Sequence, residues 1–343
     1  MEPEMAVPLC LASRQTRVVL AGDHMQLGAI VHCPVASRFG LRVSLQERLL
    51  KTMPHYRASL RVQQKLRTKE EDSEIICKKM TMTAHLTDNY RSHPAILNCF
   101  SNLFYRDALR PKADKKITHA LVDWEELPNR NDFPCFFYGI VGKDSYNSES
   151  GSLCNQSEAD AIAHLIRHLI LKSKLRHDLQ LQEIGVIAPF RNQVLLIRKV
   201  LRKAKLGAVN VGSVDDFQGK ETKVIFISTV ISRDRMVLRK MEDSANGIGI
   251  FSNPKRFNVA ISRAKSLMVV VGNPFILARK AWWKNILTYC VERGAYAGID
   301  RGDEFLEIVS GSIHNLGAGE SLQDSMMRAS EFFSAERRWR IMA

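Results

Sequence analysis

Residues 211–229 read VGSVDDFQGKETKVIFIST, a polar loop with a glycine that runs into an apolar stretch. That stretch, VIFIST at 224–229, is too short for a buried helix and is rich in β-branched residues. Three other runs share this character: VVLA at 18–21, IGVIA at 184–188 and LMVVVG at 267–272. Strands that are covered on both faces have such sequences, so the four runs predict a parallel sheet.

Helical patterns lie between the predicted strands. From Glu158 to Leu171 the apolar residues fall on one side, and from Asn192 to Ala204 an apolar stripe lies opposite a basic one. We also expect a helix at 44–50, a short strand at 209–211 and an amphipathic helix at 322–341. The alternation of strands and helices predicts an α/β fold in which helices flank a parallel sheet.

Length and charge narrow the class of protein. With 343 residues, of which 45% are hydrophobic and 25% charged, the chain is long enough for about two folded domains. Lys and Arg number 50 against 36 Asp and Glu, and the formal net charge of +14 favours a polyanionic partner, nucleic acid first. A solvated surface with a basic bias is the alternative that charge alone leaves open.

Membrane, secretion and metal signals are weak. No window approaches the roughly 18 uninterrupted apolar residues of a membrane span, and Glu2 and Glu4 stand where a signal peptide carries Lys or Arg. The seven cysteines are odd in number and form no C-x-x-C pair, which predicts reduced thiols and no metal site. We therefore expect a soluble, non-secreted chain without a membrane partner.

The string VVLAGDHMQLG at 18–28 is the first candidate for chemistry. Its predicted strand ends at Gly22 and Asp23, and Gln26 follows just past the carboxyl edge, where open α/β sheets place ligands. A strand followed by a Gly-Asp turn is also common in proteins without a site there. The string alone therefore leaves a structural interpretation open.

The string LTDNYRSHPAIL at 86–97 is the second candidate. A polar loop presents Tyr90 and Arg91 before a helix that Ser92 is expected to cap. A ring that stacks on a base, beside a guanidinium that forks onto phosphate oxygens, is a workable nucleotide clamp. The structural alternative is a surface arginine beside a packed tyrosine.

Two further strings carry polar side chains next to predicted strands. In 211–229, Glu221 has the chemistry to accept hydrogen bonds from a ribose, and Ser213 has the chemistry to hold a phosphate. In NPKRFNVAISRAKSLMVVVGNP at 253–274, Arg263 is expected near a helix end, where it reaches a cleft beside the sheet and acts as an arginine finger. A solvated basic face accounts for three nearby cations: Lys255, Arg256 and Lys265.

Taken together and in this order, these strings resemble the second half of superfamily 1 helicases of the Upf-like group. GDHMQL resembles motif III, NYRSHP the loop with the base-stacking Tyr, IGVIAPFRNQ motif IV, GSVDDFQGKE motif V and RFNVAISRAK motif VI. DFPCFFYGIVGKD at 132–144 and NQSEA at 155–159 point to the Armitage branch of RNA helicases. The resemblance covers about residues 1–299 and implies a RecA-like P-loop NTPase fold.

The resemblance implies a role for each matching position. These are γ-phosphate sensing by Gln26 with support from Asp23, base stacking by Tyr90, γ-phosphate contact by Arg91 and Arg263, ribose binding by Glu221 with Gln218 nearby, and an RNA track along Pro189, Phe190, Arg191, Ser213 and Val214. The implied cofactors are ATP and Mg²⁺, and the implied substrate is single-stranded RNA gripped without sequence preference. Ala29 stands where the family usually has Pro, which is expected to loosen the motif III loop.

The resemblance also divides the chain. It implies a C-terminal remnant of a first RecA-like domain at 1–50, a basic insertion or linker at 51–85, a complete second RecA-like domain at 86–299, and a partly flexible tail at 300–343. Relatives of this branch lead us to expect a cytoplasmic protein, in ribonucleoprotein granules, with RNA silencing or mRNA turnover as its process. Silencing or mRNA-decay proteins are the expected protein partners.

One part of the family pattern is missing. The sequence holds neither a G-x-x-x-x-G-K-[ST] phosphate loop nor the acidic motif II that binds Mg²⁺. We therefore expect the 343-residue chain alone to hydrolyse ATP at or near background, and the metal ligands to lie in a part of the protein before Met1. A non-enzymatic RNA-binding or interaction fragment is the alternative. A dinucleotide enzyme is disfavoured because no G-x-G-x-x-G turn is present.

Overall fold

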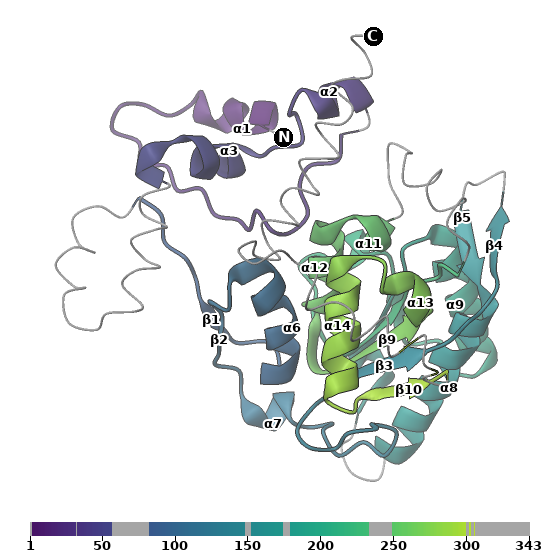
Figure 1. The fold of residues 1–343 in the computed structure, drawn as a ribbon. Coiled ribbons are helices and arrows are strands. Elements are labelled where there is room, and N and C mark those ends of the chain that lie inside the picture. The colour runs from purple at the N-terminus through teal and green to yellow at the C-terminus, as the bar shows by residue number, and fades with distance from the viewer. Residues whose placement is uncertain are drawn as a thin grey trace. The chain divides into compact units, whose positions relative to one another are not determined.

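The computed structural model describes residues 2–31, 33–56, 82–147, 152–173, 179–232 and 249–299, together with Gly302 and Phe305. These residues fall into two compact units, divided between Thr87 and Asp88 (Figure 1). The predicted helix at 322–341 and most of the expected insertion and tail lie outside the described residues. The described cysteines are free thiols.

The first unit is helical in its described part. It contains α1 (Glu2–Leu9), α2 (Pro34–Arg38) and α3 (Leu45–Thr52). Ser44 caps α3 by accepting a hydrogen bond from the backbone N–H of Glu47, so the helix expected at 44–50 is confirmed. The strand predicted at 18–21 is wrong: these residues are irregular, and Val19 is 87% exposed. The described part of this unit offers no other strand with which it can pair.

The second unit is built on a parallel sheet of six strands in the order β10-β3-β9-β8-β6-β7. The strands are β3 (Cys135–Gly139), β6 (Ile184–Ile187), β7 (Asn210–Gly212), β8 (Thr222–Ser228), β9 (Ala264–Gly272) and β10 (Tyr296–Gly298). The central strands β6, β8 and β9 carry nearly continuous buried runs. The three apolar runs predicted in this unit are thus strands, as expected.

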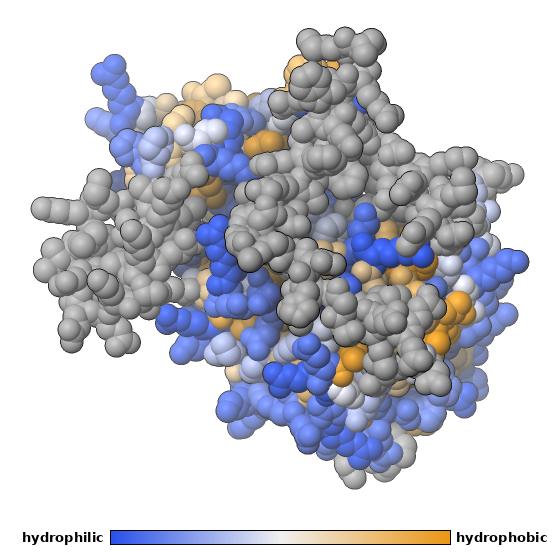
Figure 2. All heavy atoms as spheres, viewed as in Figure 1, coloured by the Kyte–Doolittle hydropathy of each residue, from blue (hydrophilic) through white to orange (hydrophobic). Residues whose placement is uncertain are grey.

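Helices cover both faces of the sheet (Figure 1). On one face α8 (Gln156–Ser173) and α9 (Arg191–Lys203) bury apolar side chains against Val224, Phe226 and Val269. On the other face α6 (Pro94–Tyr105), α12 (Pro254–Ile261) and α14 (Ala281–Glu292) pack together, joined by Phe257 and Trp283. Hydrophilic side chains predominate on the described surface of this unit that is visible around α8 in Figure 2.

The remaining elements of the second unit are short. They are the parallel pair β1 (Asp88–Asn89) and β2 (Arg110–Pro111), α7 (Lys115–Thr118), the antiparallel pair β4 (Asp144–Asn147) and β5 (Ser152–Asn155), the 3₁₀ turns η1 (Leu181–Glu183) and η2 (Asp215–Phe217), α11 (Gly249–Ser252) and α13 (Pro274–Leu277). The polar stretch 144–151 indicates a loop in the sequence, but its described part, 144–147, forms β4 and pairs with β5. Asp144 is buried, whereas Ser145 and Tyr146 are exposed, so this strand has no apolar alternation that the sequence could reveal.

Candidate functional site

Arg91, Glu221 and Lys265 meet beside the starts of β8 and β9. The Nε of Arg91 donates to Glu221 Oε2, and Lys265 Nζ lies 2.9 Å from Glu221 Oε1. Lys265 first, and then Arg91, lower the pKa of Glu221 below its usual value, against a partial burial that raises it. The carboxylate is therefore ionised at neutral pH and bridges two cations. The sequence predicted Arg91 and Glu221 here and missed Lys265.

The loop that carries Arg91 is tied to the start of β9. The Asn89 side-chain oxygen accepts hydrogen bonds from the backbone N–H groups of Arg91 and Ser92, at 3.0 and 2.9 Å. Ser92 does not cap α6 as predicted; its hydroxyl donates to the Ala264 carbonyl at 2.8 Å, and His93 is the N-cap. Ser92 thus attaches the loop to the start of β9, and α6 begins after it at Pro94.

Arg263 lies next to Arg91, with Ser262 between them. Arg91 Nη1 donates to the Ser262 carbonyl at 3.2 Å, and Arg263 Nη2 donates to the Ser262 hydroxyl at 2.8 Å. The structure therefore brings together the two guanidinium groups that the sequence analysis assigned to one phosphate. Arg263 is only 2% exposed, because its Nε also donates to the Val259 carbonyl and its Nη1 to the Lys220 carbonyl. The expected reach into an open cleft is thus absent in this state.

The other predicted nucleotide-contacting residues are more accessible. Tyr90 is 75% exposed, as a ring that stacks on a base must be, and Gln218 is also exposed. Gly219 follows with φ of +78°, and a Cβ built there would meet nothing within 4 Å. In the first unit, Asp23 accepts hydrogen bonds from the Gln26 side chain at 2.8 Å and from the Met25 backbone at 2.9 Å, so it supports that loop.

The predicted RNA-contacting residues lie at the opposite edge of the sheet. Pro189, Phe190 and Arg191 follow the carboxyl end of β6, and Ser213 follows that of β7, so parallel strands deliver them to one edge. Arg191 is exposed, and Pro189 and Phe190 are half-buried. Val214 is 1% exposed, so only its main chain can reach a ligand.

Asp216 holds the Ser213 end of the loop. Both the backbone N–H and the hydroxyl of Ser213 donate to Asp216 Oδ2 at 2.8 Å, and these bonds lower the pKa of Asp216. From Ser213 the chain runs through η2 to Glu221 and so connects the two edges of the sheet. Asp215 in this loop pairs with Arg256 at 2.5 Å, which the sequence analysis had placed on a solvated face.

Glu158 is a carboxylate whose burial no sequence motif indicates. Glu158, which is 0% exposed, accepts hydrogen bonds on Oε2 from the Ser228 hydroxyl at 2.6 Å and from the backbone N–H groups of Thr229 and Val230 at 2.9 Å. Val230 adopts a φ of +71°, which a β-branched residue rarely does. The hydrogen bond from the Val230 backbone N–H to Glu158 stabilises that strained turn. Helical periodicity alone places Glu158 on α8 without showing that it faces the sheet.

The burial of Glu158 predicts a pH-dependent stability. Burial raises its pKa to about 7, although the bonds from Ser228, Val230 and Thr229 favour the ionised form. Because the folded pKa lies above the unfolded value, this contribution to stability is complete below the unfolded pKa and is lost as pH rises through about 7. We expect the Glu158→Gln variant to gain stability relative to the wild type, by up to about 3 kcal/mol, between about pH 5 and pH 8.

Urea denaturation at several pH values measures this difference in free energy of unfolding. Glutamine keeps one acceptor oxygen for the three donors that bond to Oε2, replaces only Oε1, which accepts the Thr229 hydroxyl at 3.3 Å, and cannot ionise, so it isolates the charge. A difference between the two proteins that stays constant from about pH 5 to pH 8 would show that Glu158 does not titrate in this range.

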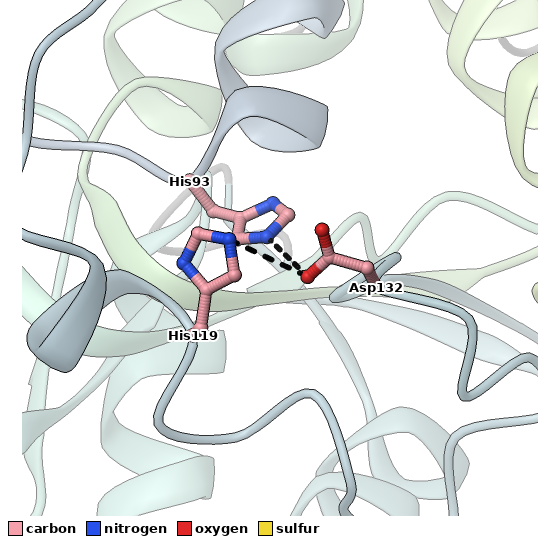
Figure 3. Close-up of side chains that lie close together, drawn as sticks. All are labelled: His93, His119 and Asp132. Atoms are coloured by element: carbon pink, nitrogen blue, oxygen red, sulfur yellow. Dashed lines mark hydrogen bonds and ion pairs between the residues drawn. The ribbon is translucent and has the colours of Figure 1, made fainter.

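His93, His119 and Asp132 form the group in the described ranges whose atoms lie close enough to hold a metal ion (Figure 3). Asp132 Oδ1 lies 3.0 Å from His93 Nε2 and 3.5 Å from His119 Nε2. His93 Nδ1 accepts the backbone N–H of Ala95 at 3.1 Å, so its neutral ring carries the proton on Nε2 and donates to Asp132. Burial lowers the pKa of His93 and favours this neutral form. The group is therefore a hydrogen-bonded anchor for the start of α6, without a lone pair of His93 left for a metal.

A parallel sheet with helices on both faces is the architecture of a RecA-like domain. The chain belongs to the AAA domain family, whose model matches residues 41–274. None of the described helices has the length and apolarity needed to cross a bilayer.

Named relatives refine the class. The chain is 38% identical to RNA helicase Mov10l1 of Mus musculus over 301 residues, and 33% identical to the probable RNA helicase armi of Drosophila melanogaster over 308 residues. It is 38% identical to the putative helicase mov-10-B.1 of Danio rerio over 313 residues. Each match covers 87% of this chain but only 24%, 24% and 29% of the relative, so the chain spans about a quarter of their length. These matches confirm the resemblance to the Armitage branch of Upf-like RNA helicases.

Proposed function

We propose that this chain is the C-terminal part of an ATP-dependent RNA helicase. The observation that carries the proposal is the convergence of Arg91 and Arg263 on Ser262, with Glu221 beside them, at the edge of the sheet opposite the predicted RNA track. Two guanidinium groups have the charge and geometry for a polyphosphate, and Glu221 has the acceptors for a ribose. Single-stranded RNA at the other edge is the proposed substrate.

The donor set fits a nucleoside triphosphate, and the resemblance to the helicase family makes ATP the proposed one. Tyr90 would stack on the base, and Arg91 and Arg263 would contact the γ-phosphate, whose charge grows during transfer. ATP, with Mg²⁺ on its phosphates, supplies the free energy for the cycle. No phosphate loop occurs in the sequence, so the phosphate loop and metal ligands would come from an N-terminal part of the protein, and Gln26 with Asp23 would sense the phosphate.

Nucleotide binding would require two local rearrangements. Arg91 is paired with Glu221, so a phosphate must take over the guanidinium while Glu221 keeps Lys265 and turns to the ribose. Arg263 is covered by Ser262 and Lys220, so the 218–220 segment must move before its guanidinium reaches a phosphate. Gly219 tolerates such a change of backbone conformation.

RNA binding would be backbone-directed. Arg191 is exposed in the first turn of α9, and backbone amides of neighbouring loops are suited to phosphates. Movement of the two RecA-like domains during the ATP cycle would then translocate the protein along one strand. A cytoplasmic role in RNA silencing or mRNA turnover, together with partners from those processes, belongs to this proposal and rests on the resemblance of the motifs to the Armitage branch alone.

RNA binding by the 343-residue chain tests the substrate assignment directly. We expect the affinity for a fluorescein-labelled oligouridylate to fall as salt rises, because phosphate contacts release counterions. Arg191→Ala should weaken binding about tenfold and reduce the slope of log K against log salt by about 0.7, the value for one contact to a single strand. Fluorescence anisotropy at several salt concentrations measures both quantities.

Arg202→Ala is the matched control for that experiment. Arg202 is an exposed arginine in the last turn of the same helix, α9, away from the predicted RNA track. We expect its affinity and salt slope to match those of the wild type. An affinity that rises with salt, or equal effects of the two substitutions, would contradict the proposed RNA track.

The second candidate function is a non-enzymatic RNA-binding or interaction fragment. The observation in its favour is that the sequence holds neither a phosphate loop nor motif II. This candidate function predicts that the chain binds RNA and does not turn over ATP, even when an N-terminal phosphate loop is joined to it. ATP turnover by this sequence joined to an N-terminal phosphate loop and motif II therefore separates the two candidates.

A further inference from the structure

Four buried polar side chains form a continuous chain of hydrogen bonds beneath the carboxyl edge of the sheet. They are Asn155 at the end of β5, Glu158 in the first turn of α8, Gln193 in the first turn of α9 and Ser228 at the end of β8, each 0% exposed. Gln193 Nε2 donates to the Ser228 hydroxyl at 3.0 Å, and that hydroxyl donates to Glu158 at 2.6 Å. A fully bonded network of this kind has one low-energy arrangement, because breaking any member leaves a buried polar group unsatisfied.

Gln193 makes the connection to β5. Its Oε1 accepts the backbone N–H of Asn155 at 2.8 Å, and its Nε2 donates to the Asn155 carbonyl at 3.1 Å. The amide thus pairs with the main chain of Asn155 as a neighbouring strand would. The Asn155 side chain continues the network by donating to the Val230 carbonyl at 3.1 Å.

The start of α9 lacks its own cap. Phe190 is the N-cap residue, and its side chain has no oxygen to accept the first free backbone N–H groups of the helix. Ser152 of β5 takes that place, because its hydroxyl accepts the backbone N–H of Asn192 at 3.1 Å. Ser152 and Gln193 therefore fix the first turn of α9 to β5 from two sides.

We propose that Gln193, assisted by Ser152, is the positioning residue for the RNA contacts of Arg191. Arg191 is the first residue of α9, so the orientation of that turn sets where its guanidinium points. Neither Gln193 nor Ser152 is exposed, so both act through Arg191 and not on RNA itself. This inference rests on the proposed RNA binding and names the residues that make its geometry rigid.

The Gln193→Met variant tests the proposal, because methionine keeps the length and volume of the side chain and removes its three hydrogen bonds. We expect the dissociation constant for a labelled oligouridylate at low salt to rise about tenfold, as for the loss of one charge-assisted contact. Gln182→Met is the matched control: Gln182 is an exposed glutamine before β6, and its variant should bind as the wild type does.

A double-mutant cycle separates positioning from general loss of structure. If Gln193 acts through Arg191, then Gln193→Met should weaken RNA binding by less than about twofold once Arg191 is already alanine. Ser152→Ala should show the same non-additivity with a smaller single effect, and it carries the test if Gln193→Met fails to fold. Circular dichroism melting confirms that each variant is folded at the assay temperature.

Three results would overturn the proposal. Tight binding by both Gln193→Met and Ser152→Ala, with Arg191→Ala still weakened, would show that Arg191 needs no positioning and would leave the proposed function intact. Additive effects in the cycle would show that Gln193 acts on the whole unit. A wild-type chain that fails to bind RNA at low salt would remove the proposed function and this inference together.

Discussion

Replacing Arg263 by alanine is expected to reduce ATP turnover by about a thousandfold or more, the usual effect of removing an arginine finger. The measurement requires this sequence joined to an N-terminal phosphate loop and motif II, since the chain alone is expected to turn over ATP at background. Arg263 lies with Arg91 against Ser262. Phosphate release at saturating ATP and RNA measures the rate.

The burial of Arg263 requires a second variant. Alanine would leave the Val259 carbonyl and the Ser262 hydroxyl without their guanidinium partner, so a loss of stability would accompany the loss of rate. Arg263→Lys keeps a charge but cannot form the same fork of hydrogen bonds. We expect Arg263→Lys to fold, to bind RNA as the wild type does, and to remain severely slowed in ATP turnover. Arg202→Ala serves as the control with unchanged turnover.

Two outcomes would contradict this assignment. Robust, RNA-stimulated turnover by the 343-residue chain alone, abolished by Arg263→Ala, would show that no further phosphate loop is needed. Normal turnover by Arg263→Ala in the longer protein would show that Arg263 is structural, as its 2% exposure in this state would then explain. Absence of turnover in the unsubstituted longer protein would favour the non-enzymatic candidate.

Local sequence patterns predicted those parts of the fold that short-range forces determine. The strands β6, β8 and β9 are uninterrupted apolar runs, and helices α8 and α9 have clear apolar stripes. The run at 18–21 has the same composition but is not a strand, because a strand needs a partner and the described part of its unit has none. Composition therefore predicts the tendency to form a strand, and pairing decides whether one forms.

The candidate site was predictable only in part, because some of its contacts depend on how distant strands pair. The adjacency of Arg91 and Arg263 follows from the family motifs, and the structure places both against Ser262. Lys265 was assigned to a solvated face, because its partner Glu221 is 44 positions away along the chain and reaches it only through the pairing of β8 with β9. Long-range ion pairs and buried networks such as that of Glu158 depend on register, which a single sequence does not reveal.

Trp283→Ala is expected to lower the free energy of unfolding by about 3–5 kcal/mol, the range for truncating a buried tryptophan. Trp283 is 0% exposed and packs edge-on against Phe257 with ring centroids 4.6 Å apart, and Phe257 in turn lies 6.2 Å from Phe104. These rings join α14, α12 and α6. Because α6 begins just after Arg91 and α12 ends just before Arg263, the same packing holds both arginines against Ser262.

Trp283→Phe is the matched variant. The indole N–H of Trp283 has no hydrogen-bond acceptor among the described residues, so phenylalanine loses volume and ring contact but no hydrogen bond. We expect Trp283→Phe to lower the free energy of unfolding clearly less than Trp283→Ala does, as measured by urea denaturation. We also expect the rate of ATP turnover of the longer protein to fall by a smaller fraction than its free energy of unfolding does. A cost below about 1 kcal/mol for Trp283→Ala would show that the site relaxes around the gap. In that case the two guanidinium groups would be kept together by the attachment of the Asn89 loop to the start of β9. The packing of Trp283, Phe257 and Phe104 would not be what holds them.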